Sequence, residues 1–205
     1  MKQTRQQALL AAALGLLLTA STAWAQQPAT MRLRGTIEAV DGNTLTLKSR
    51  DGDVKLTLAD NALIIAVIKA ALTEIREGTF LGSAAIPQAD GSQKAVEVHI
   101  FPESMRGTGE GHRPYPPVTN GTMTNGTASG ALVAAVDGSV ITVKYKDGEK
   151  KIIVAPDVPI VRYEIGGKAD LKPGAHFTVL AATKKPDGTF EASRINVGRD
   201  GAVPQ

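Results

Sequence analysis

Short runs in which apolar and polar residues alternate recur along the chain and predict β-strands. The clearest are residues 44–48 and 54–58, and weaker ones follow at 140–144 and 151–154. A period of two places the apolar side chains on one face of a strand and the polar ones on the other. Asp-Gly pairs separate the runs and favour tight hairpin turns, because glycine readily adopts positive φ. The pattern predicts an all-β chain built from antiparallel hairpins.

One module occurs twice in the sequence. The matching segments keep nearly constant spacing: 35–42 with 130–138, 43–48 with 139–144, 75–78 with 171–174, 88–91 with 185–188, and 96–100 with 193–197. Register kept over such a length indicates an internal duplication, which has to be recognised before the fold is assigned. Each copy spans roughly 70 residues, a plausible size for a minimal domain.

Residues 61–78 are ambiguous, because their Ala, Leu and Ile content also suits a helix. Their counterpart in the second copy, residues 157–174, contains Pro159, Gly166, Gly167 and Pro173, which exclude a long helix. We therefore expect a strand near 63–69 and a single helical turn over 72–77. Two further strands should follow in each copy.

The expected architecture is two tandem OB-like β-barrel modules, over residues 31–101 and 130–198. Closure of five or six short strands into a small barrel removes exposed edges. A β-sandwich is the alternative for each module. Residues 102–129 form the expected Gly/Pro-rich linker, since a segment with almost no aliphatic residues cannot bury enough surface to fold alone.

The first 25 residues have the pattern of a cleaved signal peptide. Lys2 and Arg5 precede an apolar run over residues 9–18, and small residues at Ala23 and Ala25 suit a signal peptidase. The run is shorter than the ~20 apolar residues that a spanning helix needs, so cleavage near Ala25 is favoured over a retained anchor. We expect a periplasmic or secreted protein with no transmembrane segment in the mature chain.

Loss of this signal changes the charge balance. Residues 1–25 hold two of the 23 basic residues and none of the 20 acidic ones, which leaves 21 bases against 20 acids. A nearly neutral chain with only 4% aromatic residues is not expected to bind nucleic acid. The absence of cysteine excludes disulfides and thiolate metal sites.

The repeated motifs resemble those of a widespread bacterial family of exported, small, tandem OB-like β-barrel domains of unknown function. The first copy does so through Gly-Thr-Ile-Glu-Ala-Val-Asp-Gly-Asn-Thr-Leu-Thr-Leu-Lys at 35–48 and Ile-Arg-Glu-Gly-Thr-Phe-Leu-Gly at 75–82. The second does so through Ala-Val-Asp-Gly-Ser-Val-Ile-Thr-Val-Lys at 135–144 and Leu-Lys-Pro-Gly-Ala-His-Phe at 171–177. The resemblance rests on turn glycines and apolar strand positions, so it implies a fold and hardly a function. Members often carry the label "metal ABC transporter permease", from which this sequence departs because nothing after the signal is long and apolar enough to span a bilayer.

The best candidate for a site is the segment 105–115, in which three glycines alternate with polar residues. Its backbone N–H groups are suited to cradle an anion, with added charge from two arginines. Alternatively, Met105, Glu110 and His112 could catch a soft or borderline metal, with His112 as the main ligand. The simplest reading is a flexible linker. The candidate ligand-binding residues are Arg106, Glu110, His112, Arg113 and Tyr115.

Other chemistry is weakly signalled. His99 and His176 are expected to be solvated or at the rim of a strand rather than ligands. The sequence contains no Gly-x-Ser-x-Gly elbow and no cysteine nucleophile, and its acids cluster in Asp-Gly turns, so neither an enzyme nor a cofactor is expected.

The preferred functional reading is therefore an exported, non-enzymatic binding or scaffolding protein, whose partner is an unknown periplasmic protein or small ligand. The alternative is an accessory metal-handling protein that uses the loop around His112. A hydrolase whose site is assembled from distant residues is a third and weaker reading.

Overall fold

A computed structural model describes residues 30–49, 52–136 and 138–204. The predicted signal peptide at 1–25 lies outside these residues. The described chain is built of strands and three short 3-10 turns, which confirms the all-β prediction. Within the same residues, no helix has the length and apolarity needed to cross a lipid bilayer.

The elements follow the predicted hairpins. Their bounds are β1 Thr30–Asp41, β2 Thr44–Ser49, β3 Gly52–Lys69, η1 Leu72–Glu74, β4 Phe80–Pro87, β5 Gln93–Ile100, η2 Glu103–Met105, β6 Gly111–Pro114, β7 Thr122–Ala135, β8 Gly138–Tyr145, β9 Gly148–Val154, β10 Ile160–Ile165, η3 Lys168–Asp170, β11 His176–Lys184 and β12 Phe190–Gly198. The expected turn at Asp41-Gly42 joins β1 to β2, and Gly42 supplies its positive φ of 59°. The strand expected near 63–69 is present as the second half of β3.

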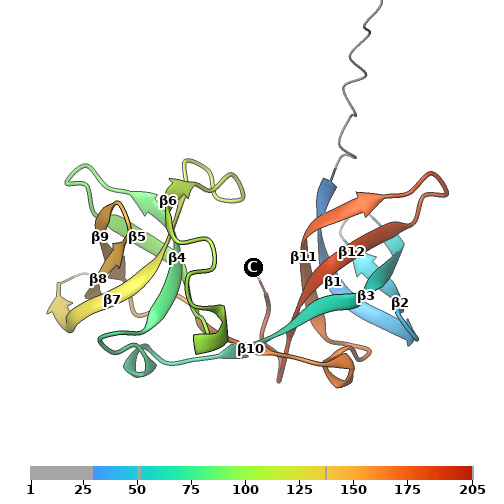
Figure 1. The fold of residues 1–205 in the computed structure, drawn as a ribbon. Coiled ribbons are helices and arrows are strands. Elements are labelled where there is room, and N and C mark those ends of the chain that lie inside the picture. Colours follow the sequence, from blue (N-terminus) through green and yellow to red (C-terminus); the bar gives the residue numbers. More distant parts are fainter. Residues whose placement is uncertain (1–29, 50–51, 137, 205) are drawn as a thin grey trace, which may run out of the picture.

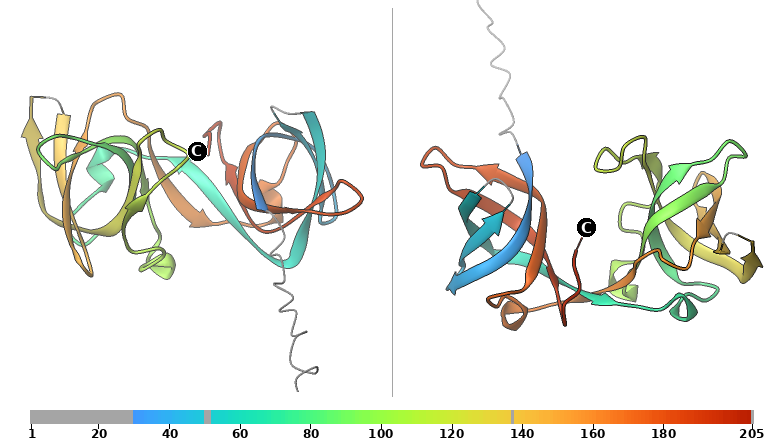
Figure 2. Two further views of the ribbon diagram at one scale, coloured as in Figure 1. Left: turned by 90° about the horizontal axis from the view of Figure 1, so that it is seen from above. Right: turned by 180° about the vertical axis from the view of Figure 1, so that it is seen from behind.

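The strands close into two five-stranded rings, hereafter the first and second barrels (Figure 1). In the first barrel the pairing runs β1–β2–β3–β12–β11 and returns to β1. In the second it runs β7–β8–β9–β5–β4 and returns to β7. The barrels lie side by side, and β3 and β10 cross from one to the other (Figures 1 and 2).

Each barrel takes strands from both halves of the chain. The first barrel joins β1–β3 of the first repeat to β11 and β12 of the second, so it combines blue and cyan with orange and red in Figure 1. The second barrel joins β4 and β5 to β7–β9. The tandem grouping over residues 31–101 and 130–198 therefore does not describe this pairing. The physical reason is β3, which is 18 residues long in all and, after pairing with β2 in the first barrel, continues toward the second instead of folding back.

The junction between the barrels is nearly symmetric. β3 pairs antiparallel with β10, and Val67 lies opposite Tyr163, its counterpart in the repeat. On one side of this pair, β3 runs parallel to β12 with Ile64 opposite Ile195. On the other side, β10 runs parallel to β5 with Ile160 opposite Val98. The two halves are thus related by a pseudo-two-fold axis through the centre of the junction.

The expected linker at 102–129 is largely structured. It contains η2, β6 and the start of β7, and residues 122–127 of β7 pair with β4. Thr124 and Asn125 on β7 are both buried, at 0% and 4% exposure. The composition of this segment predicted a linker because its polar residues are typical of loops. In the structure the same polar side chains are buried on a strand.

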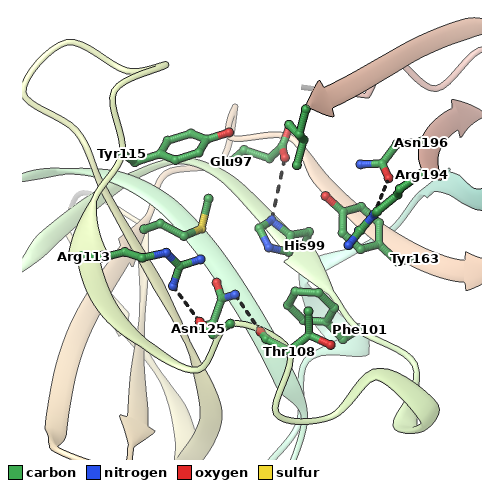
Figure 3. A pocket seen from close by; sticks show the side chains of 13 residues that line it. Glu97, His99, Phe101, Thr108, Arg113, Tyr115, Asn125, Tyr163, Arg194 and Asn196 are labelled. Atoms are coloured by element: carbon green, nitrogen blue, oxygen red, sulfur yellow. Dashed lines mark hydrogen bonds and ion pairs between the residues drawn. The ribbon is translucent and has the colours of Figure 1, made fainter. Parts of the chain in front are cut away.

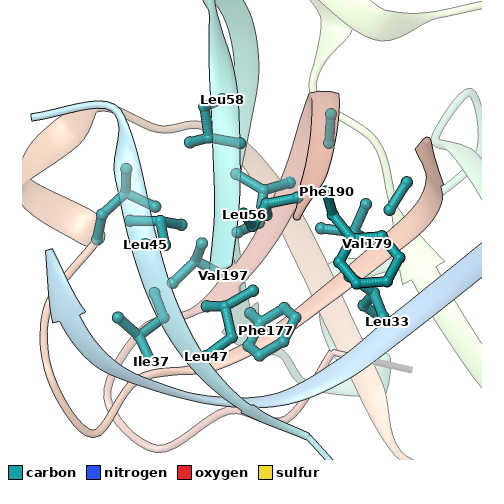
Figure 4. Packing of buried hydrophobic residues seen from close by; sticks show 14 of the residues in the cluster. Leu33, Ile37, Leu45, Leu47, Leu56, Leu58, Phe177, Val179, Phe190 and Val197 are labelled. Carbon is teal, nitrogen blue, oxygen red and sulfur yellow. The ribbon is translucent and has the colours of Figure 1, made fainter. Parts of the chain in front are cut away.

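Separate hydrophobic cores fill the two barrels. In the first, Leu45 and Leu47 of β2 pack with Phe177 and Val179 of β11 (Figure 4). In the second, residues of β4 and β5 pack with residues of β8 and β9. Each fully buried aliphatic or aromatic side chain contributes about 1.5–3 kcal/mol. Both cores therefore hold the two halves of the chain together.

An ion-pair network ties the end of the first barrel to the crossing strand. The Arg199 guanidinium donates to the Asp170 carboxylate at 2.9 and 3.2 Å and to Glu164 Oε2 at 2.8 Å. The hydrogen bond from Arg199 lowers the pKa of the Asp170 carboxyl below its ordinary value. The network thus links η3, β10 and the segment that follows β12.

Substituting Arg199→Met is expected to lower the free energy of unfolding by about 1 kcal/mol at pH 7. Because the pKa of Asp170 is depressed in the folded state, its contribution is fully present above its unfolded pKa, roughly 4, and is lost as the pH falls through the folded value. Urea unfolding of both proteins from pH 7 down to acid checks this. Their stabilities should converge in acid, and a constant difference at every pH would contradict the role of the network.

Candidate functional site

A cavity of about 150 Å³ lies where the two barrels face each other (Figure 3). The second barrel contributes residues of β5 and β7, and the first contributes residues of β11 and β12. Residues 108–115 and β10 supply the remaining walls. The lining residues are Glu97, His99, Phe101, Thr108, Gly109, Arg113, Tyr115, Met123, Asn125, Tyr163, Leu180, Arg194 and Asn196.

The alternation of β5 directs two polar side chains into this cavity. Val98 faces the core of the second barrel, so Glu97 and His99 point outward from it. The first barrel covers this outward face, which leaves Glu97 only 6% exposed and His99 only 5% exposed. The expectation that His99 is solvated or at a rim is therefore wrong, because an outward face of one barrel is an inward face of the pair.

The equivalent strand of the first barrel presents the matching positions. Arg194 and Asn196 on β12 correspond to Glu97 and His99 in the repeat, and they line the cavity from the opposite side. The Arg194 Nε donates to Asn196 Oδ1 at 3.3 Å. The pseudo-two-fold axis thus brings two polar pairs of different chemistry to one cavity.

An aromatic cluster forms one wall. The His99 ring stacks on Tyr163 with centroids 5.0 Å apart, and Phe101 meets both rings edge-on. Burial raises the pKa of Tyr163 well above its ordinary value, and the charge of Glu97 adds to this shift. The Tyr163 phenol therefore stays protonated at neutral pH.

Buried polar atoms without partners gather at this cavity. His99 Nδ1 has no hydrogen-bond partner, and its nearest carboxylate, Glu97 Oε1, lies 3.8 Å away. Asn125 donates from Nδ2 to the Thr108 carbonyl at 3.0 Å, but its Oδ1 accepts nothing. Such atoms are few in folded proteins, and each costs about 1–3 kcal/mol.

A third unpaired atom lies beside the site. Arg32 Nε is buried without a partner, while Arg32 Nη1 contacts the Tyr115 hydroxyl at 3.5 Å at the edge of the cavity. Among the described residues, these three are the buried side-chain nitrogen and oxygen atoms that lack partners. Their shared location marks the cavity as the place where the fold leaves polar groups unsatisfied.

The charges around the cavity are unequal. Glu97 is the one carboxylate among its lining residues, whereas Arg113 and Arg194 both line it and Arg32 lies beside it. Within the described chain, none of these three arginines forms an ion pair with a carboxylate at 4.0 Å or less. Arg113 Nη1 instead donates to the Gly109 carbonyl at 2.6 Å. Positive charge is therefore available at the edges of the cavity.

The structure divides the five residues that the sequence suggested. Arg113 and Tyr115 line the cavity. Arg106 does not, because its guanidinium donates to the Glu103 carboxylate and the Gly78 carbonyl and lies over the Phe80 ring. Glu110 also lies elsewhere, where its Oε1 accepts from the Lys146 backbone N–H at 3.1 Å. Both contacts fix the shape of the loop.

His112 lies outside the cavity as well. Its Nδ1 is 2.8 Å from Thr124 Oγ1, and its ring stacks on Tyr145 with centroids 6.4 Å apart. Burial, followed by the charge of Lys150, lowers the pKa of His112, so the imidazole is neutral at pH 7. No group of three or more His, Asp or Glu side chains that could hold a metal occurs in the described part of the chain.

Gly82 on β4 has no side chain, and His99 and Asn125 occupy the space that a side chain would need. A Cβ there would overlap His99 Nε2 and lie 2.5 Å from Asn125 Oδ1. We expect Gly82→Ala to displace the imidazole and to lower the free energy of unfolding by about 1–3 kcal/mol.

The penalty of Gly82→Ala should shrink when His99→Ala removes the ring. Urea unfolding of both single variants and the double variant measures this coupling as a double-mutant cycle. Equal costs in the two backgrounds would show that the ring does not lie against Gly82.

Comparison with family models, with curated proteins and with solved structures finds no match to this chain.

Proposed function

We propose that this chain is an exported, non-enzymatic binding protein that holds a small polar ligand in the cavity between its two barrels. One observation carries the proposal: the buried polar atoms without partners gather at that cavity. A fold that leaves His99 Nδ1 and Asn125 Oδ1 unsatisfied gives up stability. A bound ligand that pairs with them recovers this loss.

The size and place of the cavity support the same conclusion. Cavities of about 150 Å³ accept molecules of the size of benzene. Binding sites occur preferentially where two domains meet, and they combine apolar walls with a few convergent polar groups. Here the walls are Phe101 and Tyr163, and the convergent groups are Glu97, His99 and Asn125.

The architecture that we propose for each barrel is OB-like. Both are closed five-stranded rings in which two of the neighbouring strands run parallel, and a 3-10 turn precedes the hairpin β11–β12 of the first barrel and the hairpin β4–β5 of the second. OB-like barrels commonly serve as binding modules. Export rests on the signal-like segment 1–25 and on the resemblance of the repeated motifs to an exported family.

Amide NMR spectroscopy tests this function. The protein is titrated with a low-molecular-weight extract of bacterial cells, which contains the common small solutes. We expect chemical-shift changes confined to cavity residues from both barrels, such as His99 and Asn196. An extract that shifts none of these resonances would contradict the proposal.

Asn125→Leu supplies the matched variant for this titration. It removes the unpaired carbonyl at nearly constant volume and should weaken the response. Asn61→Leu makes the same chemical change at an exposed position on β3 and should leave the response unchanged. Equal responses in the two variants would show that the chemical-shift changes do not arise from binding in this cavity.

A further inference from the structure

The polar groups of the cavity that can still accept or donate hydrogen bonds are of two kinds, and each kind selects a different part of a ligand. One set consists of acceptors, Glu97 and Asn125. The other set consists of arginines, Arg113 and Arg194, which have N–H donors to spare. A ligand that satisfies both sets has to carry donors at one end and acceptors at the other.

The acceptor end is almost closed to water. Glu97 is 6% exposed, and its carboxylate lies 3.8 Å from His99 Nδ1. Asn125, 4% exposed, presents a second acceptor without a donor. Burying a carboxylate without a hydrogen bond is costly unless an opposite charge accompanies it. An ammonium group supplies that charge together with three N–H donors.

The aromatic wall suits the same group. Phe101 and Tyr163 line the cavity beside Glu97 and His99 (Figure 3). The faces of aromatic rings attract cations, most strongly where water is excluded. The wall also offers apolar surface to the short carbon body of a ligand.

The donor end lies at the edges of the cavity. Arg113 and Arg194 approach from opposite sides of His99 in Figure 3, and neither is paired with a carboxylate within the described residues. A guanidinium binds a carboxylate through two parallel N–H···O bonds. The cavity therefore has a place for an anionic group as well as for a cationic one.

We propose that the ligand is a small zwitterion of the amino-acid class, with its ammonium group on Glu97 and its carboxylate on an arginine of the cavity edge. This proposal rests on the proposed function, since it names the class of ligand that the cavity holds. The volume of about 150 Å³ limits the ligand to a short carbon chain.

A matched series of five-carbon probes tests the proposal by isothermal titration calorimetry on the mature protein. The series is 2-aminopentanoate and 5-aminopentanoate as zwitterions, pentanoate as the anion, and pentylamine as the cation. One of the zwitterions is expected to bind at least tenfold more tightly than both singly charged probes. Equal or tighter binding of pentanoate or pentylamine would overturn the zwitterion, and so would the failure of all four probes to bind.

Three variants locate the ends of the ligand. Glu97→Gln keeps the shape of the side chain and is expected to weaken the zwitterion about tenfold while leaving pentanoate unchanged. Arg113→Gln and Arg194→Gln are made in parallel, and one of them is expected to weaken the zwitterion and pentanoate together while sparing pentylamine; no effect of either would overturn the arginine contact. Parallel losses for all probes in Glu97→Gln and in that arginine variant would overturn the assignment of the two ends.

A stability readout separates this result from misfolding. Because Glu97→Gln removes a buried charge that lacks a hydrogen bond, the melting temperature of the ligand-free variant should not fall. The proposed function is judged separately by the cell-extract titration. Shifts from the extract combined with four silent probes would overturn the zwitterion and leave the binding function standing.

Discussion

Residues 26–110, produced without the rest of the chain, are not expected to form a folded monomer. They contain three strands of the first barrel and two of the second, so neither ring can close. The open edges and apolar faces, including Leu45 and Leu81, would be exposed to water. The expected result is that the monomeric fragment shows no cooperative unfolding transition.

Size-exclusion chromatography and circular dichroism check this result, and residues 111–205 provide the complementary half. Mixing the two halves should restore the β-sheet spectrum in a 1:1 complex. A dimer of the first half alone, in which two copies complete each other's barrels, agrees with the exchange of strands between the two repeats. A monomeric first half that unfolds cooperatively would contradict it.

Phe177→Ala is expected to lower the free energy of unfolding by about 3–5 kcal/mol. Phe177 is 1% exposed in the core of the first barrel, where it packs with residues of the other half of the chain. This loss is a large part of the 5–15 kcal/mol that stabilises a typical domain. Because β3 and β10 cross between the barrels, the second barrel should unfold at the same lowered temperature.

Amide resonances of Leu45 and Leu81, one in each barrel, follow the two cores during thermal unfolding. Val133→Ala is the control, since that side chain is 61% exposed and its loss should cost little. Retention of the Leu81 signal up to the wild-type melting temperature would mean that the barrels unfold independently.

Much of the fold could be predicted from the sequence because its signals are local. Alternation and Asp-Gly turns identify β2 and the first half of β3, and the prolines and glycines of the second repeat exclude a helix at 61–78. Which hairpin completes which barrel is not local information. The two repeats offer similar final hairpins, so the pattern of either half fits both barrels equally well.

The site was harder to predict for the same reason. Alternation on β5 places His99 on the outward face of the second barrel, and only the packing of the first barrel against that face shows that it is covered. Arg113 and Tyr115 were identified from the glycine-rich segment around them. Glu97, Tyr163, Arg194 and Asn196 were missed, although the polar pairs 97/99 and 194/196 occupy equivalent positions in the repeat and offered a signal.

Exchange of strands between the repeats is the central claim, because it creates the cavity, and a disulfide tests it most directly. Thr36 on β1 lies opposite His176 on β11. Directly opposed residues of antiparallel strands have Cα atoms about 4.5–5.5 Å apart, which suits a disulfide, and the chain has no other cysteine. The variant Thr36→Cys/His176→Cys also receives a protease site between Thr119 and Asn120.

After oxidation and cleavage, strand exchange predicts that the two halves migrate as one species in denaturing gels and separate only on reduction. Thr36→Cys alone is the control and should separate without reductant. Two free fragments from the oxidised double variant would contradict the pairing of β1 with β11, and with it the cavity that this pairing helps to form.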